Sequence, residues 1–455
     1  MTVREWTQDR WSRKRLGCRR VPALLACMAS ALVLSTPVAA QHAELDANER
    51  AMAAWIDDNA DDAVDLLESL VNLSSGTMNH EGVRQVGAVL RQELDDLGLA
   101  TEWIELPPEL NRAGHLVGRQ DGTRGPRLLM IGHLDTVFEA DDDFQAFRRE
   151  GNIATGPGVD DMKSGDVVIV YALKALQHIG LLEDMQVVAF FTGDEEMAGR
   201  PLSVSRKHLV EAGKWADVAL GFEGASFREG RDWATVARRG TSDWRLEVSG
   251  TQAHSSRVFG DSVGAGAIFE AARILNAFYE EVRGEEYLTF NAGTIQGGTD
   301  VEFDFEETRG TTFGKTNVVP RKVIVHGDMR TLSLEQLERA EKAMRAIVAN
   351  HLPHTEASIT FGEGYPPMAP TEGNIRLQEK MSAINQALGR GPMDALDPSF
   401  RGAADISFVA PYADGLAGLG ANGRGGHTPN ESLELDSIPL AVKRAAILMY
   451  RLINE

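Results

Sequence analysis

From residue 46 onward, apolar and polar residues follow the periods expected of helices and strands. Residues 46–73 and 80–97 carry apolar positions at helical spacing. In the second segment these positions form one stripe, made of Val83, Val86, Val89, Leu90, Leu94 and Leu97. Because a helix repeats every 3.6 residues, both segments are predicted to be amphipathic helices that pack one face against a core.

Short apolar runs then alternate with helical segments. The runs at 127–131, 186–191 and 217–222 are apolar at nearly every position, and helical patterns at 165–178 and 204–212 separate them. Strands that are apolar throughout are buried on both faces, which is typical of a mostly parallel sheet between two helical layers. The pattern therefore predicts an α/β domain.

The pattern changes near Thr235. Strands are predicted at 244–250, 287–295 and 322–330, and helices at 262–278 and 334–352. This block is predicted to be a smaller α+β unit inserted into the α/β domain.

The last part of the chain returns to the first pattern and ends in a predicted helix at 437–452. The expected organisation is therefore an α/β domain in two parts, at 41–234 and 365–455, with the inserted unit at 235–364 between them. The acidic segment 299–310 is expected to be an exposed hairpin or loop, and binding of a partner there is the less favoured interpretation.

Residues 1–40 have the pattern of a signal peptide. A basic stretch reaches Arg20, an apolar run covers 21–34, and the small residues Val38 and Ala40 precede Gln41. This predicts cleavage before Gln41 and a periplasmic or secreted protein. A retained anchor and twin-arginine export are the alternatives. No later stretch is apolar enough to span a bilayer, so the mature chain is expected to have no membrane span.

Charge and cysteine usage narrow the possible partners. The chain has 455 residues and a formal charge of −21; seven basic and two acidic residues give the leader +5, so the remainder carries −26. This balance argues against nucleic acid as a partner, because phosphate backbones need clustered Lys and Arg. Both cysteines, Cys18 and Cys27, lie in the leader. Any metal site in the remainder must therefore use histidine and carboxylate ligands.

Side chains that bind divalent cations recur at the ends of the predicted strands. They are His133 and Asp135 in GHLDTV, Asp160 and Asp161 in GPGVDDMKSG, Glu195 and Glu196 in TGDEEMAG, Glu223 in GFEGA and His427 in GRGGHTPNE. Each alone has an ordinary alternative: a structural His–Asp pair, a helix cap or a solvated acidic loop.

Their common placement favours a metal site, because crevices in open α/β sheets lie at the carboxyl ends of strands. Two histidines with several carboxylates suit two zinc ions, with Co²⁺ or Mn²⁺ as alternatives. Such a pair can lower the pKa of a water and polarise a carbonyl. A neighbouring carboxylate that is not a ligand can then accept the proton of the water.

These motifs, in this order and together with NVVP, GDMR and GAAD, resemble the co-catalytic zinc exopeptidase family of glutamate carboxypeptidase (carboxypeptidase G), aminoacylase and acetylornithine deacetylase. The resemblance runs from about residue 60 to the C-terminus. It implies a mixed sheet flanked by helices, with an inserted α+β lid and dimerisation domain.

The resemblance also implies roles for individual residues. Asp161 would bridge two metal ions, His133 and Glu223 would complete one site, and Glu196 and His427 the other. Glu195 would be the general base, and Asp135 would orient His133. A peptide bond in the cis conformation is expected at Asp161–Met162.

In the lid, the resemblance assigns His254 to a histidine that reaches the active site of the partner subunit and steadies the oxyanion. Asn317 and Arg330 would hold the terminal carboxylate of the substrate, which suits the bidentate geometry of arginine. The substrate would be a small peptide or an N-acyl amino acid, and the enzyme would be a homodimer through its lid.

The sequence departs from the family pattern at four site positions. Asp160 stands where relatives carry a small residue, and Ser164 and Ala403 replace common glycines. Tyr365 stands where glutamate-releasing relatives carry an arginine, which weakens the prediction that this enzyme releases glutamate. The segment 299–315 is also longer than usual.

The leading hypothesis is a two-metal carboxypeptidase, and an N-acyl amino acid deacylase of the same fold is the first alternative. Two other classes of protein are alternatives: a serine hydrolase and a binding protein without catalysis. The sequence GDSVG at 260–264 matches the nucleophile motif of serine hydrolases, with His427 downstream. A periplasmic metal- or solute-binding protein without catalysis is the other, although binding alone does not need a carboxylate such as Glu195.

Overall fold

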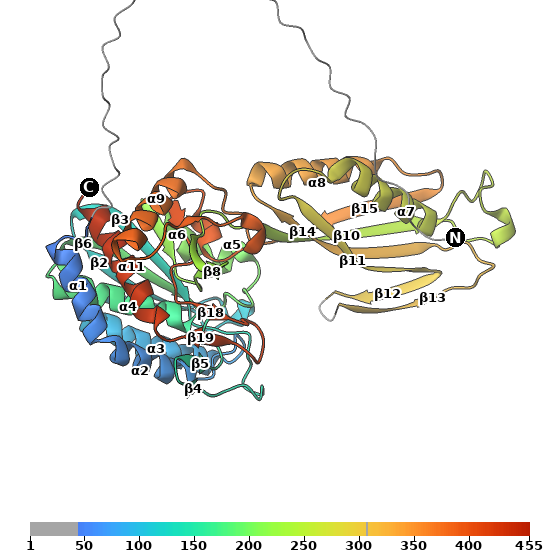
Figure 1. Ribbon diagram of the computed structural model, residues 1–455. Helices are drawn as coiled ribbons and strands as arrows, with labels where there is room; N and C mark the ends of the chain where they lie inside the picture. Colours follow the sequence, from blue (N-terminus) through green and yellow to red (C-terminus); the bar gives the residue numbers. More distant parts are fainter. Residues whose placement is uncertain (1–43, 306–307) are drawn as a thin grey trace, which may run out of the picture. The chain divides into compact units, whose positions relative to one another are not determined.

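A six-stranded mixed sheet is the centre of the larger domain in the computed structural model, which describes residues 44–305 and 308–455 (Figure 1). The strand order is β1-β2-β6-β3-β7-β17. Strands β6, β3, β7 and β17 run parallel, whereas β1 and β2 are antiparallel to their neighbours. The strands are β1 (Ala100–Ile104), β2 (His115–Asp121), β3 (Arg124–His133), β6 (Met185–Thr192), β7 (Val218–Gly221) and β17 (Asp414–Leu416).

Both faces of this sheet are buried, as the apolar runs predict. In β3, Leu128 and Met130 belong to one hydrophobic cluster, and Leu129 and Ile131 belong to another. Helices α4 and α11 cover the first face, and α6 and α10 cover the second. Because successive side chains of a strand point to opposite faces, a strand between two helical layers must be apolar throughout.

The helices of this domain are α1 (Ala47–Asp58), α2 (Ala60–Val71), α3 (His80–Asp96), α4 (Lys163–His178), α5 (Leu202–Ser205), α6 (Lys207–Trp215), α9 (Glu372–Ala387), α10 (Ile406–Val409) and α11 (Ser437–Ile453). The segment 46–73, predicted as one helical region, is two helices. Asn59 separates them with a non-helical backbone (φ −112°, ψ 17°), and its side-chain amide donates to the carbonyl of Trp55.

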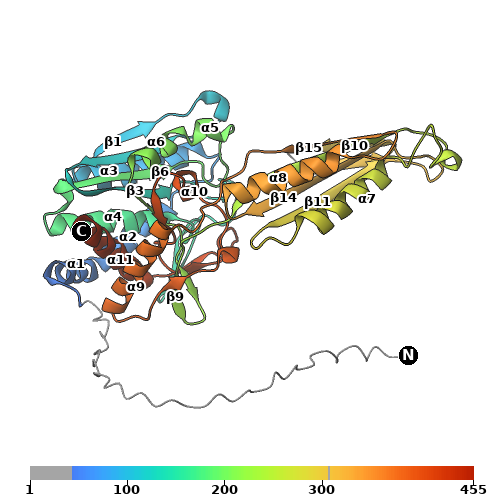
Figure 2. The same cartoon turned by 90° about the horizontal axis from the view of Figure 1, so that it is seen from above.

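A second sheet, of four antiparallel strands, lies between the two parts of the first domain in the sequence (Figures 1 and 2). Its order is β11-β14-β10-β15, and its strands are β10 (Gly240–Gly250), β11 (Thr289–Gly298), β14 (Lys322–Thr331) and β15 (Thr355–Phe361). Helices α7 (Ala267–Ala277) and α8 (Leu334–Ala349) cover one face, where Trp244, Leu246 and Val325 form the core.

The segment 299–310 was predicted to be a hairpin or a loop, and it lies in a β-hairpin. Strands β12 (Asp300–Asp304) and β13 (Arg309–Phe313) form the hairpin. Phe305 stacks against Arg245 and His326, which alternate along their strands with the core residues. The hairpin therefore packs on the face of the second sheet opposite to α7 and α8.

Two small sheets complete the fold. Strands β8 (Ser226–Arg228), β9 (Arg231–Ala234) and β16 (Asp394–Ala395) form one, and β4 (Arg148–Glu150), β5 (Ile153–Thr155), β18 (Gly423–Arg424) and β19 (Ser432–Glu434) form the other. The second of these holds the loop that carries His427. Neither sheet was predicted, because strands of two to four residues leave no clear hydrophobic period.

The predicted fold class is confirmed: a mixed sheet flanked by helices with a smaller α+β unit inserted. The predicted signal peptide, 1–40, lies outside the described residues. Within 44–305 and 308–455, no helix combines the length and the apolar character needed to cross a membrane.

Candidate metal centre

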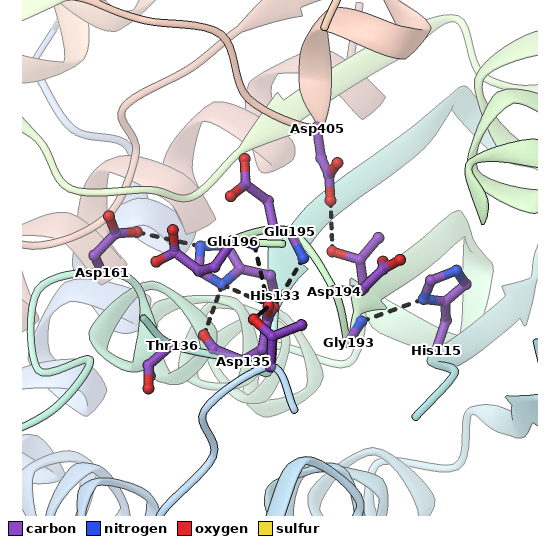
Figure 3. Close-up of polar contacts among 12 residues, drawn as sticks. His115, His133, Asp135, Thr136, Asp161, Gly193, Asp194, Glu195, Glu196 and Asp405 are labelled. Carbon is purple, nitrogen blue, oxygen red and sulfur yellow. Dashed lines mark hydrogen bonds and ion pairs between the residues drawn. The ribbon is translucent and has the colours of Figure 1, made fainter. Parts of the chain in front are cut away.

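Four side chains, one from the end of β3 and three from separate loops, meet at the carboxyl end of the central sheet. Nε2 of His133 lies 3.2 Å from Oδ1 of Asp161, and Nε2 of His427 lies 3.1 Å from Oδ2 of the same carboxylate. Nε2 of His427 is also 3.1 Å from Oε2 of Glu196. Donor atoms of His133, Asp161 and Glu196 all fall within 4.8 Å of one another. Figure 3 shows Asp161, His133 and Glu196 facing a common space.

Each of these residues is held where a regular element begins or ends. His133 is the last residue of β3, and Glu196 lies four residues after β6 ends. Asp161 lies in the turn before α4, and the bond Asp161–Met162 is cis, as expected. His427 lies in the loop between β18 and β19 with a φ of 63°. Its side chain is 56 % exposed, so the cluster opens to solvent on that side.

The cluster needs positive charge. Burial alone would raise the pKa of Asp161, but the hydrogen bonds and charges of His133 and His427 hold that pKa well below its usual range. Hydrogen bonds to Asp161 and Glu196 raise the pKa of His427 to about 11. Burial raises the pKa of Glu196 to about 7, against the hydrogen bond to His427. In this arrangement, protonated imidazoles stand between the carboxylates.

Divalent cations fit the same donor set. Oε1 of Glu196 is buried and has no hydrogen-bond partner, so an acceptor points into the cluster without a donor. Imidazole nitrogens and carboxylate oxygens are the ligands that zinc and related ions use in catalytic sites. Asp161 offers one oxygen toward each histidine, which is the arrangement that a carboxylate shared by two cations requires.

Asp135 lies beside His133, and its carboxylate has further partners that the sequence does not predict. Nδ1 of His133 is 3.0 Å from the backbone carbonyl of Asp135 and 3.6 Å from its carboxylate. The carboxylate also accepts the backbone N–H groups of Glu195 and Glu196 at 2.9 and 3.1 Å and the hydroxyl of Thr77 at 2.6 Å. Asp135 therefore contacts the ring of His133 and also fixes the backbone that carries Glu195 and Glu196.

The side chain of Glu195 lies next to the cluster. Burial, together with the charges of Asp405, Glu223 and Glu196, raises its pKa well above the usual range, although His133 opposes the shift. A carboxylate with a raised pKa is a stronger proton acceptor. The geometry thus separates Glu195 from Glu196, whose carboxylate contacts His427.

Glu223 is not part of the four-residue cluster. Its carboxylate forms an ion pair with Arg238, which also donates to the carbonyl of Gly402 at 2.7 Å. Glu223 is nevertheless close enough to Glu195 for its charge to raise the pKa of that group. To act as a metal ligand, Glu223 must share its carboxylate between a cation and Arg238.

Arg330 lines a cleft of about 420 Å³ together with Glu195, Glu196 and Tyr365. Its Nε is 3.2 Å from Asp328, which leaves the other guanidinium nitrogens for a further acceptor. Asn317 and His254 lie together elsewhere in the second domain, where Ser255 donates its backbone N–H to the carbonyl of Asn317. Both are exposed, and no contact among the described residues joins either side chain to the metal-donor cluster.

The sequence GDSVG does not have the geometry of a serine nucleophile. It lies in turns between a short 3-10 helix (Ser255–Arg257) and α7, not between a strand and a helix. The exposed hydroxyl of Ser262 accepts a hydrogen bond from Arg257 at 3.0 Å. The serine-hydrolase hypothesis therefore lacks structural support.

Sequence reasoning assigned no role to Glu431, although it ends the motif GHTPNE. Its fully buried carboxylate accepts the backbone N–H groups of Gly158, Asp160 and Asp161 at 3.1, 2.7 and 2.9 Å. Glu431 thereby fixes the turn that carries Asp161. A single glutamate at the end of a Gly-rich loop gives no signal of contacts to a turn 270 residues away.

Known proteins resemble this chain over most of its length. Residues 129–451 match the model of peptidase family M20/M25/M40. Carboxypeptidase G2 of Pseudomonas sp. (strain RS-16) is 26 % identical over 431 residues, which is 94 % of this chain and 96 % of that protein. A succinyl-diaminopimelate desuccinylase of Delftia acidovorans (strain DSM 14801 / SPH-1) is 25 % identical over 384 residues, with 82 % and 93 % covered.

The solved structure of a Bacillus subtilis protein, which is described as a dinuclear metal-binding peptidase of the M20 family, has the same fold. Its TM-score is 0.59 at 14 % identity, over 88 % of this chain and 99 % of that one. Because the family model covers well over half of the sequence, the chain belongs to peptidase family M20/M25/M40 and is a hydrolase of the metallopeptidase and amidohydrolase class.

Proposed function

We propose that this enzyme hydrolyses an amide bond next to a free C-terminal carboxylate, with Glu195 as the general base. The observation that carries the proposal is the meeting of His133, Asp161, Glu196 and His427 beside Glu195 at one end of a cleft that Arg330 also lines. The similarity to carboxypeptidase G2 supports the same reaction class.

The proposed cofactor is a pair of zinc ions, with Co²⁺ or Mn²⁺ as alternatives. Asp161 would be shared, since each of its oxygens faces one histidine. His133 and Glu223 would complete one site, and Glu196 and His427 the other. When bound, the two cations would lower the pKa of the attacking water and polarise the scissile carbonyl. The description of the B. subtilis structure as dinuclear supports two ions.

The remaining chemistry falls to the side chains. Glu195 accepts a proton from the water and delivers it to the departing amine, which its raised pKa favours. Arg330 holds the carboxylate of the substrate through its free guanidinium nitrogens, with Asn317 as a second contact. Asp135 keeps the backbone of Glu195 and Glu196 fixed beside the cations.

We also propose a homodimer through the second domain, in which His254 of the partner subunit completes the site and stabilises the oxyanion. Exposed apolar side chains on α7, on the adjacent strand β11 and on a nearby loop support an interface there; they are Phe259, Ile268, Phe269 and Ile295. An isolated exposed apolar residue is ordinary, but four on neighbouring elements favour a buried contact. The predicted signal peptide makes the periplasm or the exterior the proposed location.

A second candidate is an N-acyl amino acid deacylase, and the resemblance to the D. acidovorans desuccinylase favours it. Both reactions break an amide beside a free carboxylate, so the same residues serve both. They differ in the acyl part of the substrate, which is an amino acid or peptide in the first reaction and a simple acyl chain in the second.

A hydrolysis screen of dipeptides and N-acyl amino acids, varied at the C-terminal residue, tests the proposal. Each substrate is paired with its C-terminal amide. We expect free acids to be hydrolysed and amides to be poor substrates, because Arg330 loses its ionic partner. Equal hydrolysis of both forms would contradict the proposal. Preference for acyl chains over dipeptides would select the second candidate.

A further inference from the structure

Tyr365 lies directly behind the proposed general base. Its hydroxyl donates a hydrogen bond of 2.7 Å to the backbone carbonyl of Glu195. The same oxygen accepts a hydrogen bond of 2.8 Å from Nη2 of Arg206. The phenol ring packs edge-on against Phe408, with centroids 4.8 Å apart. The hydroxyl is therefore committed to the protein on both its donor and its acceptor side.

The backbone of Glu195 is thus held from both sides. Asp135 accepts the N–H groups of Glu195 and Glu196, and Tyr365 donates to the carbonyl between them. The peptide unit that joins the proposed base to the proposed ligand Glu196 has both of its polar groups bonded. A side chain on a doubly anchored peptide has little freedom to change its direction, which is what a general base near its proton requires.

The anchor behind Tyr365 is rigid. Arg206 is 1 % exposed and binds the carboxylates of Asp194 at 2.6 Å and of Asp405 at 2.7 Å. Its Nη2 also donates to the carbonyl of Asp194 at 2.9 Å. Because every contact of this guanidinium is to a buried or half-buried acceptor, the position of the Tyr365 hydroxyl is fixed by charge-assisted bonds.

We propose that Tyr365 is a positioning residue, whose hydroxyl sets the direction of the Glu195 side chain through the Glu195 carbonyl. The inference rests on the proposed role of Glu195. It gives position 365 a use different from that of the arginine found there in glutamate-releasing relatives. It also links the base to the segment that returns from the second domain, since Tyr365 accepts the backbone N–H of Thr241 at 2.9 Å.

The test is Tyr365→Phe in the metal-loaded enzyme, which removes only the hydroxyl. We expect kcat to fall between about 10- and 100-fold, because small displacements of a reacting group have effects of that size. KM and bound metal should stay as in the wild type. Because Tyr365→Phe keeps the ring that lines the cleft and removes only a hydroxyl that is bonded to the protein, the loss should be the same factor for every substrate of the panel. A loss that differs between C-terminal residues, or a raised KM with unchanged kcat, would overturn the inference.

Tyr450→Phe is the matched control. The Tyr450 hydroxyl also has two partners, donating to Asp46 at 2.9 Å and accepting from Asn48 at 3.2 Å, but it lies between α11 and the start of α1. We expect kcat to be unchanged in this variant. An equal loss of kcat in both variants would mean that the effect reflects general destabilisation, and would overturn the inference.

A double variant separates this inference from the proposed function. In Glu195→Gln, the base is gone, so adding Tyr365→Phe should lower kcat no further. A further tenfold loss would show that Tyr365 acts by another route, and the inference would fail while the function stands. Full activity of Glu195→Gln alone would remove the proposed base and, with it, the role of Tyr365.

Discussion

Two polar clusters lie side by side at the end of the central sheet, and they satisfy their charges differently. In the cluster of Arg206, Asp194 and Asp405, the buried cation is bonded to both carboxylates, and Tyr365 and Thr192 take further bonds. In the metal-donor cluster of His133, Asp161, Glu196 and His427, a buried oxygen of Glu196 has no hydrogen-bond partner among the described residues, and the carboxylates of Asp161 and Glu196 contact imidazoles.

This difference indicates that the Arg206 cluster supports the fold, whereas the metal-donor cluster is a binding site. Buried ion pairs persist when each charge has its partner, as Arg206 does. In the metal-donor cluster the positive charge between the carboxylates comes from protonated imidazoles, which give up their protons when a cation binds. The comparison therefore predicts that the metal-donor cluster depends on bound cations and that the Arg206 cluster does not. Experiments on each cluster can test whether the two clusters differ in this way.

Removal of metal should have the largest effect. After chelation and dialysis, we expect hydrolysis to fall below detection and to return with Zn²⁺ or Co²⁺, while far-UV circular dichroism still shows the folded chain. Metal content is measured by mass spectrometry. An enzyme dialysed without chelator is the control, and turnover that persists without metal would contradict the proposed mechanism.

Glu195→Gln should have the next largest effect. Loss of a general base costs between about 10² and 10⁴ in rate, so kcat should fall by that factor. The metal content should stay unchanged, because the carboxylate of Glu196, not of Glu195, contacts His427. Steady-state kinetics with metal analysis tests this, and a kcat close to wild type would assign the base elsewhere.

Arg206→Met tests the support cluster. Asp194 and Asp405 would lose their buried partner, so the free energy of unfolding should fall by about 3–5 kcal/mol. The control is Arg127→Met, which breaks a half-exposed pair with Asp217 and should cost much less, because solvent screens the pair. Urea unfolding measures both. Equal losses in the two variants would refute the distinction between a buried support and a surface pair.

Metal affinity should rise with pH. Hydrogen bonds to carboxylates raise the pKa of His427 to about 11, and Asp161 and its neighbours outweigh burial to raise the pKa of His133. In the cation-free protein His427 therefore keeps its proton up to about pH 11, His133 keeps its proton to a higher pH than an ordinary imidazole, and a cation must displace these protons. Each displaced proton changes the apparent affinity up to about tenfold per pH unit. Calorimetry in buffers of different ionisation enthalpy detects the release, and an affinity independent of pH would contradict it.

The convergence of the metal-donor residues could be predicted because each follows a strong local signal. His133, Glu196 and Glu223 come after apolar strands, and Asp161 and His427 lie in Gly-rich turns. In an α/β sheet, the ends of parallel strands meet at one edge, so the periodicity alone indicates that these residues converge. The structure brings four of the five into contact and leaves Glu223 with Arg238.

The support cluster could not be predicted in the same way. Arg206 and Asp405 are separated by 199 residues, and Tyr365 and Glu195 by 170. Each lies in a segment whose pattern is explained by a helix, a loop or a family motif, and no local period indicates a partner so far away. The hydrogen bonds of the Asp135 carboxylate to the backbone of Glu195 and Glu196 could not be predicted for the same reason, since these partners lie 60 and 61 residues away.

The two connections to the second domain are bonded to each other where they leave the first. Arg238 and Met368 exchange backbone hydrogen bonds of 2.9 Å, and Thr241 donates to Tyr365 at the same distance. The inserted piece thus begins and ends at one point of the host. An inserted domain whose ends are adjacent can be lengthened, shortened or exchanged without a change in the fold of the domain that carries it. The sequence of the second domain can therefore change as a unit, while the residues proposed to hold the cations remain on the first domain.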